Sequence, residues 1–181
     1  MAFKNKSVGK AHSVTRFYIA GLKDRGPELA ALNDNYKGTL LVEHTNKLQA
    51  TYAEQKARAL QEIETVKAEL IAALDSNKGL DAAKLTPDYE LLRLPVILTG
   101  DEILELNRRN PNDVLFTRAL RQYAKQHGIE ADITDTYANR RAAIDELINH
   151  TAAIIKNDDA ETFRDLDTMG AYERLDDRIT V

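Results

Sequence analysis

The chain of 181 residues has no cysteine, no tryptophan, and only four prolines and eight glycines. The lack of cysteine excludes a disulfide scaffold, a thiolate nucleophile and a cysteine-bound zinc site. Sparse proline and glycine are typical of long helices and not of a β fold with many turns. No apolar run approaches the roughly 18–20 residues of a membrane span, and no signal-peptide pattern follows Met1. We therefore expect a soluble protein of a reducing compartment, with no membrane segment.

Charge is nearly balanced overall but unevenly distributed. Acidic residues outnumber basic ones by 29 to 25, which disfavours wholesale wrapping of nucleic acid. The first 25 residues hold six bases and one acid, whereas residues 157–181 hold eight acids and three bases. We predict a basic N-terminal arm (1–25) and an acidic C-terminal tail (158–181). The arm is either solvated and disordered or a docking segment for an acidic protein surface or a genome, through Lys4, Lys6, Lys10 and Arg16.

The middle of the chain predicts a long helix. Gly26-Pro27 is expected to begin the segment 26–79, Gly38 to end or kink a first helix, and Asn77-Lys78-Gly79 to stop the second. From Thr39 to Asp75 strong helix formers dominate and nothing breaks the helix. At about 1.5 Å per residue, this span forms a rod roughly 55 Å long.

An apolar stripe follows one face of this rod with a period near eleven residues. It consists of Leu48, Tyr52, Ala59, Ile63, Val66, Leu70 and Leu74. Such a narrow stripe requires a second helix to cover it, either a back-folded helix of the same chain or another copy. The hypothesis that we carry forward is self-association, with all of these except Ala59 as partner-binding residues.

The remaining segments also predict helices, so the expected fold class is all-α: a long helix with a coiled-coil-like stripe plus a compact bundle of shorter helices. Val14, Phe17, Tyr18 and Leu22 recur at helical spacing and suggest a short anchoring segment, although 16–22 and 94–98 could also be short strands. A hinge is expected over 80–98, and it should contain a one- or two-turn helix that Pro87 begins and Pro95 ends. Apolar contacts of this helix are expected from Tyr89, Leu91, Leu92 and Leu94. The helical bundle is expected over 99–157. Capping signals lie at Thr99/Glu102, Asn110-Pro111, His127-Gly128 and Asp158/Glu161.

No motif for catalysis, nucleotide binding or metal ligation is present, so we expect neither an enzyme nor a cofactor. Nucleic-acid binding is a live alternative, because helices at about 100–109 and 111–126 could form a helix-turn-helix-like unit. Its candidate contacts are Arg108, Arg109, Arg118, Arg121 and Lys125. Acidic neighbours favour a salt-bridged helix face instead, and we interpret Arg140 and Arg141 in the same way.

Residues 86–129 carry a further pattern. It comprises 86–92 (TPDYELL), 98–106 (LTGDEILEL), and Asn110-Pro111 through Arg118 to 123–129 (YAKQHGI). This stretch resembles small helical head-morphogenesis proteins of tailed bacteriophages. The resemblance implies a structural, scaffold-like or head-associated protein that binds itself and coat or other virion proteins. It would act in the host cytoplasm during assembly and could remain in the virion. The alternative is a DNA-binding protein or a small regulator that binds a host partner.

Overall fold

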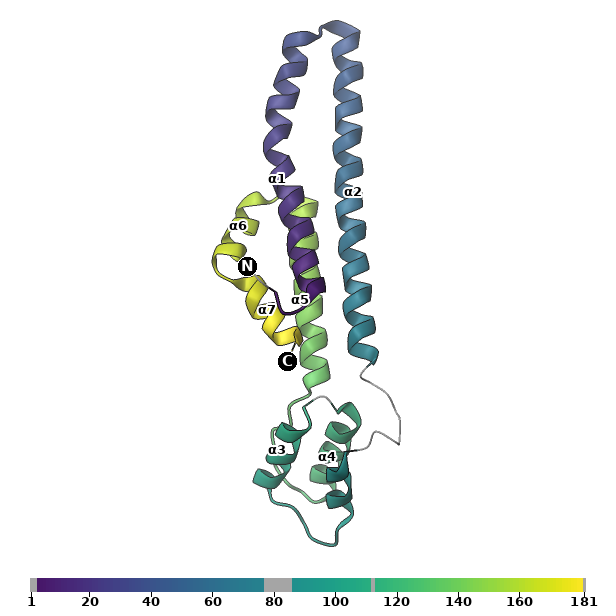
Figure 1. The fold of residues 1–181 in the computed structure, drawn as a ribbon, viewed down its shortest axis with the longest axis vertical. Coiled ribbons are helices and arrows are strands. Elements are labelled where there is room, and N and C mark those ends of the chain that lie inside the picture. The colour runs from purple at the N-terminus through teal and green to yellow at the C-terminus, as the bar shows by residue number, and fades with distance from the viewer. Residues whose placement is uncertain (1–2, 77–85, 112, 181) are drawn as a thin grey trace. The chain divides into compact units, whose positions relative to one another are not determined.

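The computed structural model describes residues 3–76, 86–111 and 113–180, and every regular element in these ranges is helical. The predicted all-α fold class is therefore confirmed. The elements are α1 (Lys6–Asn35), α2 (Gly38–Ser76), the 3-10 helix η2 (Pro87–Arg93), α3 (Gly100–Arg109), α4 (Val114–Gln126), α5 (Thr136–Asn157), α6 (Ala160–Thr168) and α7 (Ala171–Thr180) (Figure 1). The chain divides into two compact units. Unit 1 comprises residues 1–70 and 143–181, and unit 2 comprises residues 71–142.

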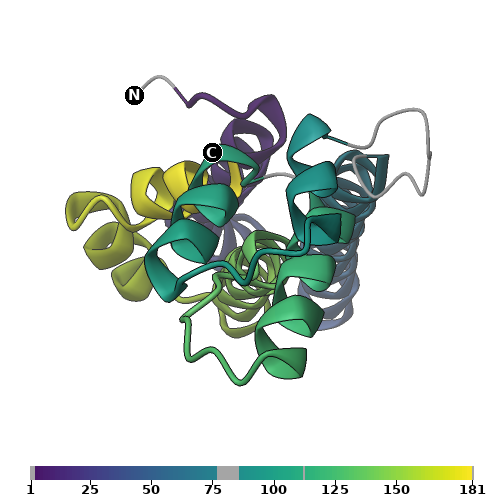
Figure 2. The same cartoon turned by 90° about the horizontal axis from the view of Figure 1, so that it is seen from below.

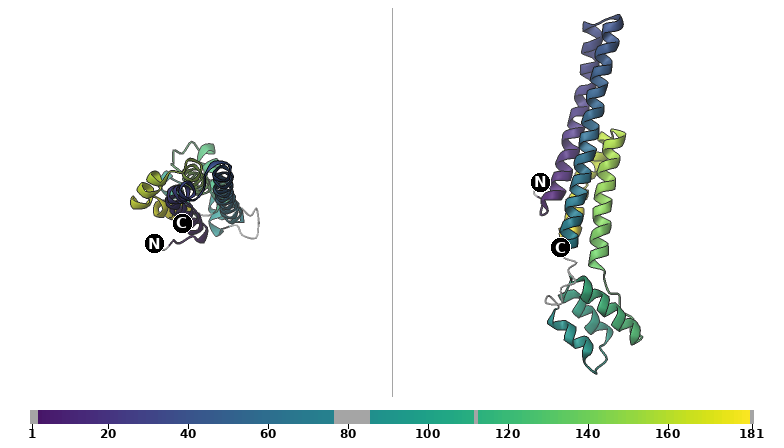
Figure 3. Two further views of the ribbon diagram at one scale, coloured as in Figure 1. Left: turned by 90° about the horizontal axis from the view of Figure 1, so that it is seen from above. Right: turned by 90° about the vertical axis from the view of Figure 1, so that its right-hand side faces the viewer.

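Unit 1 is built on an antiparallel hairpin of α1 and α2. Asn5 caps α1, and its side chain accepts a hydrogen bond from the backbone N–H of Ser7 at 2.9 Å. At the far end, Tyr36 is extended and Gly38 has φ +62°, a left-handed conformation that glycine adopts without strain. The chain therefore reverses there, and α2 returns beside α1 (Figure 3).

The core of unit 1 forms where α5, from residue 143 onward, lies alongside this hairpin (Figures 1 and 3). Its buried side chains include Val8, Ala11 and Ile19 of α1, Ile63, Val66 and Leu70 of α2, and Ile144, Leu147, Ile148, Ile154 and Ile155 of α5. By contrast, no side chain is buried between residues 20 and 58, all of which the structure describes. This stretch, the hairpin end, consists of two helices that lie side by side (Figure 3), with contacts such as the Arg25 guanidinium over the Tyr52 ring between them.

Three predicted boundaries in unit 1 are wrong. The helix α1 continues through Gly26 and Pro27, with Pro27 inside the helix, although proline removes the hydrogen bond to the carbonyl four residues earlier and its ring crowds that carbonyl. The arm 1–25 is therefore not a separate mobile segment, and 16–22 is helix and not strand. The tail 158–181 forms α6 and α7, which pack on α1 through buried side chains such as Phe163 and Tyr172.

Unit 2 centres on α3 and α4, which lie side by side (Figure 2). Its core contains Ile103, Leu106, Phe116, Leu120, Tyr123, Ala124 and Ile133. The predicted capping box is present, since Thr99 accepts from the backbone N–H of Glu102 and the Glu102 carboxylate accepts from that of Thr99. Asp113 caps the N-terminus of α4. After the C-terminus of this helix, Gly128 has φ +67°.

Two domain predictions in this region also need correction. The short helix predicted within 80–98 is present as η2, and its Tyr89, Leu91 and Leu92 make the predicted apolar contacts. The assignment of this segment as a hinge is wrong from residue 86 onward, because these side chains and Leu98 pack against the core of unit 2. The first residues of the segment, like the predicted stop at 77–79, lie outside the described residues, and 94–98 contains no strand. The bundle 99–157 is not one unit, because α5 belongs to unit 2 at its start and to unit 1 from residue 143.

Candidate interaction surfaces

The apolar stripe of α2 is covered mainly by the chain itself. Ile63 and Val66 are fully buried, and Leu70 and Leu74 nearly so, whereas Leu48 and Tyr52 on the hairpin end are half-buried. The prediction that the four buried residues bind a partner is therefore wrong. Tethered helices of one chain cover such a stripe without the translational and rotational entropy cost of association.

The basic residues of the N-terminal segment have different surroundings. The Nζ atom of Lys4 lies 2.8 Å from Oδ1 of Asp177, and that of Lys10 lies 2.9 Å from Oε1 of Glu69. The hydrogen bond and charge of Asp177 raise the pKa of Lys4. Lys6 and Arg16 are exposed and form no ion pair within the described part of the chain. Two of the four predicted contacts are thus held by acids of the same chain.

A carboxylate near the other end of the chain fixes the start of α1. Asp176 of α7 is only 3% exposed. Its Oδ2 accepts from the backbone N–H of Lys4 at 2.6 Å, and its Oδ1 from that of Asn5 at 2.9 Å. The oppositely charged segments predicted from composition therefore bind each other.

His12 adds a buried contact between the same segments. Its Nε2 lies 2.8 Å from Oδ1 of Asp167, and its ring packs against those of Phe163 and Tyr172, with centroids 5.7 and 4.9 Å away. Burial raises the pKa of the Tyr172 phenol. This cluster joins α1 to α6 and α7 and is structural.

A polar cluster marks the base of the hairpin end. The guanidinium of Arg25 lies over the rings of Tyr18 and Tyr52, at 5.3 and 4.8 Å from their centroids. Asp158 accepts a hydrogen bond from the Tyr18 hydroxyl, and its Oδ1 lies 3.1 Å from Nζ of Lys56. Although burial opposes ionisation, the contacts from Tyr18, Lys56 and Arg25 hold the pKa of Asp158 below its usual value.

An open groove of about 550 Å³ runs between α1 and α2. It is lined by Lys10, Ser13, Val14, Phe17, Tyr18 and Gly21 of α1 and by Gln55, Arg58, Ala59 and Glu62 of α2. Phe17 is 78% exposed, although the sequence predicted it to be part of an anchoring face. No atom outside the helix lies within 4 Å of the place where a Cβ on Gly21 would stand, so another backbone can approach closely. Arg58 and Glu62 lie one turn apart and form no ion pair within the described residues.

A second cleft, of about 740 Å³, lies between α1 and α6. Ile19 and Phe163 form its apolar floor, and Arg16 and Lys23 stand exposed along α1 at its edge. Arg164 on the α6 side is already paired, with Glu161 and Asp165 at 3.6 Å each. The carboxylates of Glu161 and Asp167 also line the cleft, while Arg16 and Lys23 form no ion pair with any described residue.

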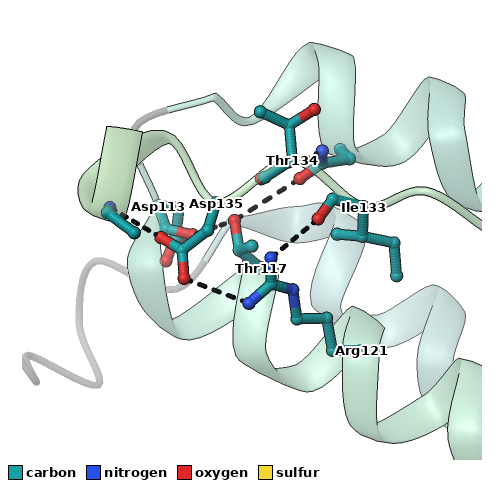
Figure 4. Close-up of polar contacts among 8 residues, drawn as sticks. Asp113, Thr117, Arg121, Ile133, Thr134 and Asp135 are labelled. Carbon is teal, nitrogen blue, oxygen red and sulfur yellow. Dashed lines mark hydrogen bonds and ion pairs between the residues drawn. The ribbon is translucent and has the colours of Figure 1, made fainter. Parts of the chain in front are cut away.

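The arginines of the possible helix-turn-helix are mostly paired. Arg108 lies 2.9 Å from Glu105, and Arg109 lies 3.9 Å from Glu105 and from Asp88. Arg121 donates to Oδ2 of Asp135 at 3.1 Å and to the carbonyl oxygen of Ile133 at 2.8 Å (Figure 4). These contacts favour the salt-bridged interpretation of this face, while Arg118 and Lys125 remain exposed without ion pairs in the described ranges.

No group of three or more metal-ligating side chains occurs among the residues that the structure describes. In those same ranges, no helix has an apolar stretch long enough to cross a membrane. Comparison of the chain with protein-family models, with curated proteins and with solved structures finds no match.

Proposed function

We propose that this chain is a structural protein that self-associates through the α1–α2 groove and takes part in the assembly of a phage-like particle. The observation that carries the proposal is the position of Phe17, which projects from the middle of a rigid helix into solvent at the edge of an open groove. Large aromatic side chains in such grooves dominate the energetics of interfaces, because they bury much area at little entropy cost.

The charges in the groove support a second copy as the occupant. In a two-fold interface the same patch faces itself, so each charged group must find its opposite within that patch. Arg58 and Glu62 meet this requirement, since an axis passing between them places Arg58 of each copy against Glu62 of the other. The small residues Gly21 and Ala59 allow the two hairpins to approach closely.

The cleft between α1 and α6 supports the second part of the proposal, docking on coat or other virion proteins. Arg16 and Lys23 beside an apolar floor suit an acidic, partly apolar segment of a partner. This cleft is separate in its lining residues from the groove, so self-association and docking can be tested independently. The resemblance of residues 86–129 to head-morphogenesis proteins supplies the biological setting.

Sedimentation velocity over a range of concentrations tests self-association. Phe17→Ser should weaken the dimer about 1,000-fold, because two copies each lose roughly 2 kcal/mol of apolar burial at 25 cal/mol per Å². Val42→Ser is the matched control, since Val42 is also an exposed apolar residue but lies outside the groove.

A charge exchange tests the two-fold arrangement itself. Arg58→Glu alone and Glu62→Arg alone should each weaken the dimer about 30-fold, through two like-charge contacts of about 1 kcal/mol each. The double variant should restore wild-type affinity. The proposal is refuted if the wild-type chain stays monomeric at about 100 µM; a dissociation constant of 1 µM corresponds to about 8 kcal/mol. It is also refuted if the double variant dimerises as weakly as the single variants.

Docking is tested with a variant that leaves the groove intact. Arg16→Glu combined with Lys23→Glu should abolish co-sedimentation with assembling particles while the dimer sediments as before. Wild-type protein that fails to co-sediment with particles in any state of assembly contradicts the assembly role but not the dimer.

A further inference from the structure

Arg140 is a buried cation that forms no ion pair with any residue the structure describes. It lies in the second turn of α5 and is 8% exposed. Its Nε and Nη2 atoms are both buried, and neither has a hydrogen-bond partner in the structure. Burial alone lowers the pKa of Arg140, with no contribution from a neighbouring acid. Because a guanidinium stays protonated in proteins, the folded chain carries this uncompensated charge.

The guanidinium borders a small cavity within unit 2. The cavity has a volume of about 10 Å³, room for one body the size of a water molecule. Leu74, Pro111 and Val114 form its apolar wall, and Thr117 and Thr136 line its polar side. Its dimensions exclude sulfate, phosphate and larger anions.

The polar groups around the cavity are engaged elsewhere. The Thr117 hydroxyl donates to the carbonyl oxygen of Asp113 at 3.0 Å. The Asp135 carboxylate accepts from Arg121 at 3.1 Å and from the backbone N–H of Ala138 at 2.9 Å (Figure 4).

Tyr137, which also lines the cavity, is engaged as well. Its hydroxyl donates to Oδ1 of Asp75 at 2.8 Å. None of these contacts supplies Arg140 with an acceptor.

We propose that this cavity binds one monatomic anion, chloride, against the Nε and Nη2 atoms of Arg140. A water molecule would satisfy the hydrogen bonds but not the charge, whereas an anion satisfies both. The site is independent of the proposed self-association.

Thermal unfolding in different sodium salts at one ionic strength tests the site. Chloride should raise the melting temperature by about 2–4 °C relative to gluconate, because a ligand that binds only the folded state stabilises it. Equal melting temperatures in chloride and gluconate would overturn the proposal.

A matched pair of variants locates the effect. Arg140→Met should abolish the difference between chloride and gluconate, whereas Arg141→Met should keep it. A chloride effect that persists in Arg140→Met overturns the proposal. If Arg140→Met does not fold, chloride NMR on the wild-type protein decides. Excess broadening of the chloride line that is lost when the protein is unfolded in urea supports the site, and the absence of such broadening refutes it.

Discussion

Replacement of Asp176 by asparagine tests whether the N-terminal segment is docked. The carboxylate accepts backbone N–H groups from Lys4 and Asn5 and lies 3.2 Å from the hydroxyl of Thr180. Asparagine keeps one oxygen but turns an NH₂ group toward one of these N–H donors. The variant therefore loses a charge-assisted hydrogen bond and leaves a partly buried N–H unsatisfied, at a combined cost of about 3 kcal/mol.

Urea unfolding followed by far-UV circular dichroism measures this cost, which corresponds to a fall in melting temperature of about 6–12 °C for a chain of this size. The matched control is Asp177→Asn, because the neighbouring Asp177 is exposed and holds only the Lys4 ammonium. It should change the free energy of unfolding by less than about 0.5 kcal/mol. Equal, small effects of the two substitutions would refute the docking of residues 4 and 5 on α7.

Three further predictions follow from the described contacts. Ile63→Ala should lower the free energy of unfolding in urea by about 2–4 kcal/mol, because Ile63 is fully buried. The control Glu64→Ala should stay within about 0.5 kcal/mol of wild type. A neutral Ile63 variant beside a destabilised Glu64 variant would contradict the burial of the stripe. The pKa of Asp158 is lowered in the folded chain, so its contribution to stability is present above the ordinary value of 3.8 and is lost as the pH falls below it. The difference in urea midpoint between wild type and Asp158→Asn should therefore be constant above about pH 5 and shrink below about pH 4. A difference that stays the same at low pH would count against this contribution. Pro27→Ala should raise stability by about 1–3 kcal/mol, because α1 regains the hydrogen bond to the Lys23 carbonyl; a destabilised variant would show that α1 ends before Pro27.

Helix caps and helix ends could be predicted from the sequence where they depend on contacts within a single turn. The capping box at Thr99 and the helix end at Gly128 depend on contacts within about four residues, and both are present. The predicted cap at Asp158 is wrong by one position. Asp158 takes the left-handed φ of +55° as α5 ends, and Asp159 supplies the cap by accepting from the backbone N–H of Thr162.

Features that depend on distant residues could not be read in the same way. The basic composition of the first 25 residues indicated a mobile arm, but the acids that hold Lys4 and Asn5 lie about 170 positions away. Likewise, Gly26-Pro27 is a valid helix start by local rules. The packing of the first half of α1 and its pairing with α2 extend one helix across it instead.

The candidate site residues show the same limit. Helical periodicity assigns Phe17 to the same face as Val14 and Tyr18, and only the positions of α2, α6 and α7 around α1 leave its ring exposed. Arg140 and Arg141 are indistinguishable as sequence neighbours, yet Arg140 is buried without a partner. The direction in which a side chain faces depends on which helices surround it, and no motif encodes that.

The division of unit 1 into two stretches of sequence has a consequence for synthesis on the ribosome. Unit 2 is continuous, so its core can form once residue 142 has left the exit tunnel. The hairpin of α1 and α2 is made first but waits with a bare apolar face until residues 143–180 emerge. During that interval Ile63, Val66 and Leu70 lack the α5 side chains beside which they are buried in the folded chain, so completing the core of unit 1 requires contacts between residues far apart in the sequence.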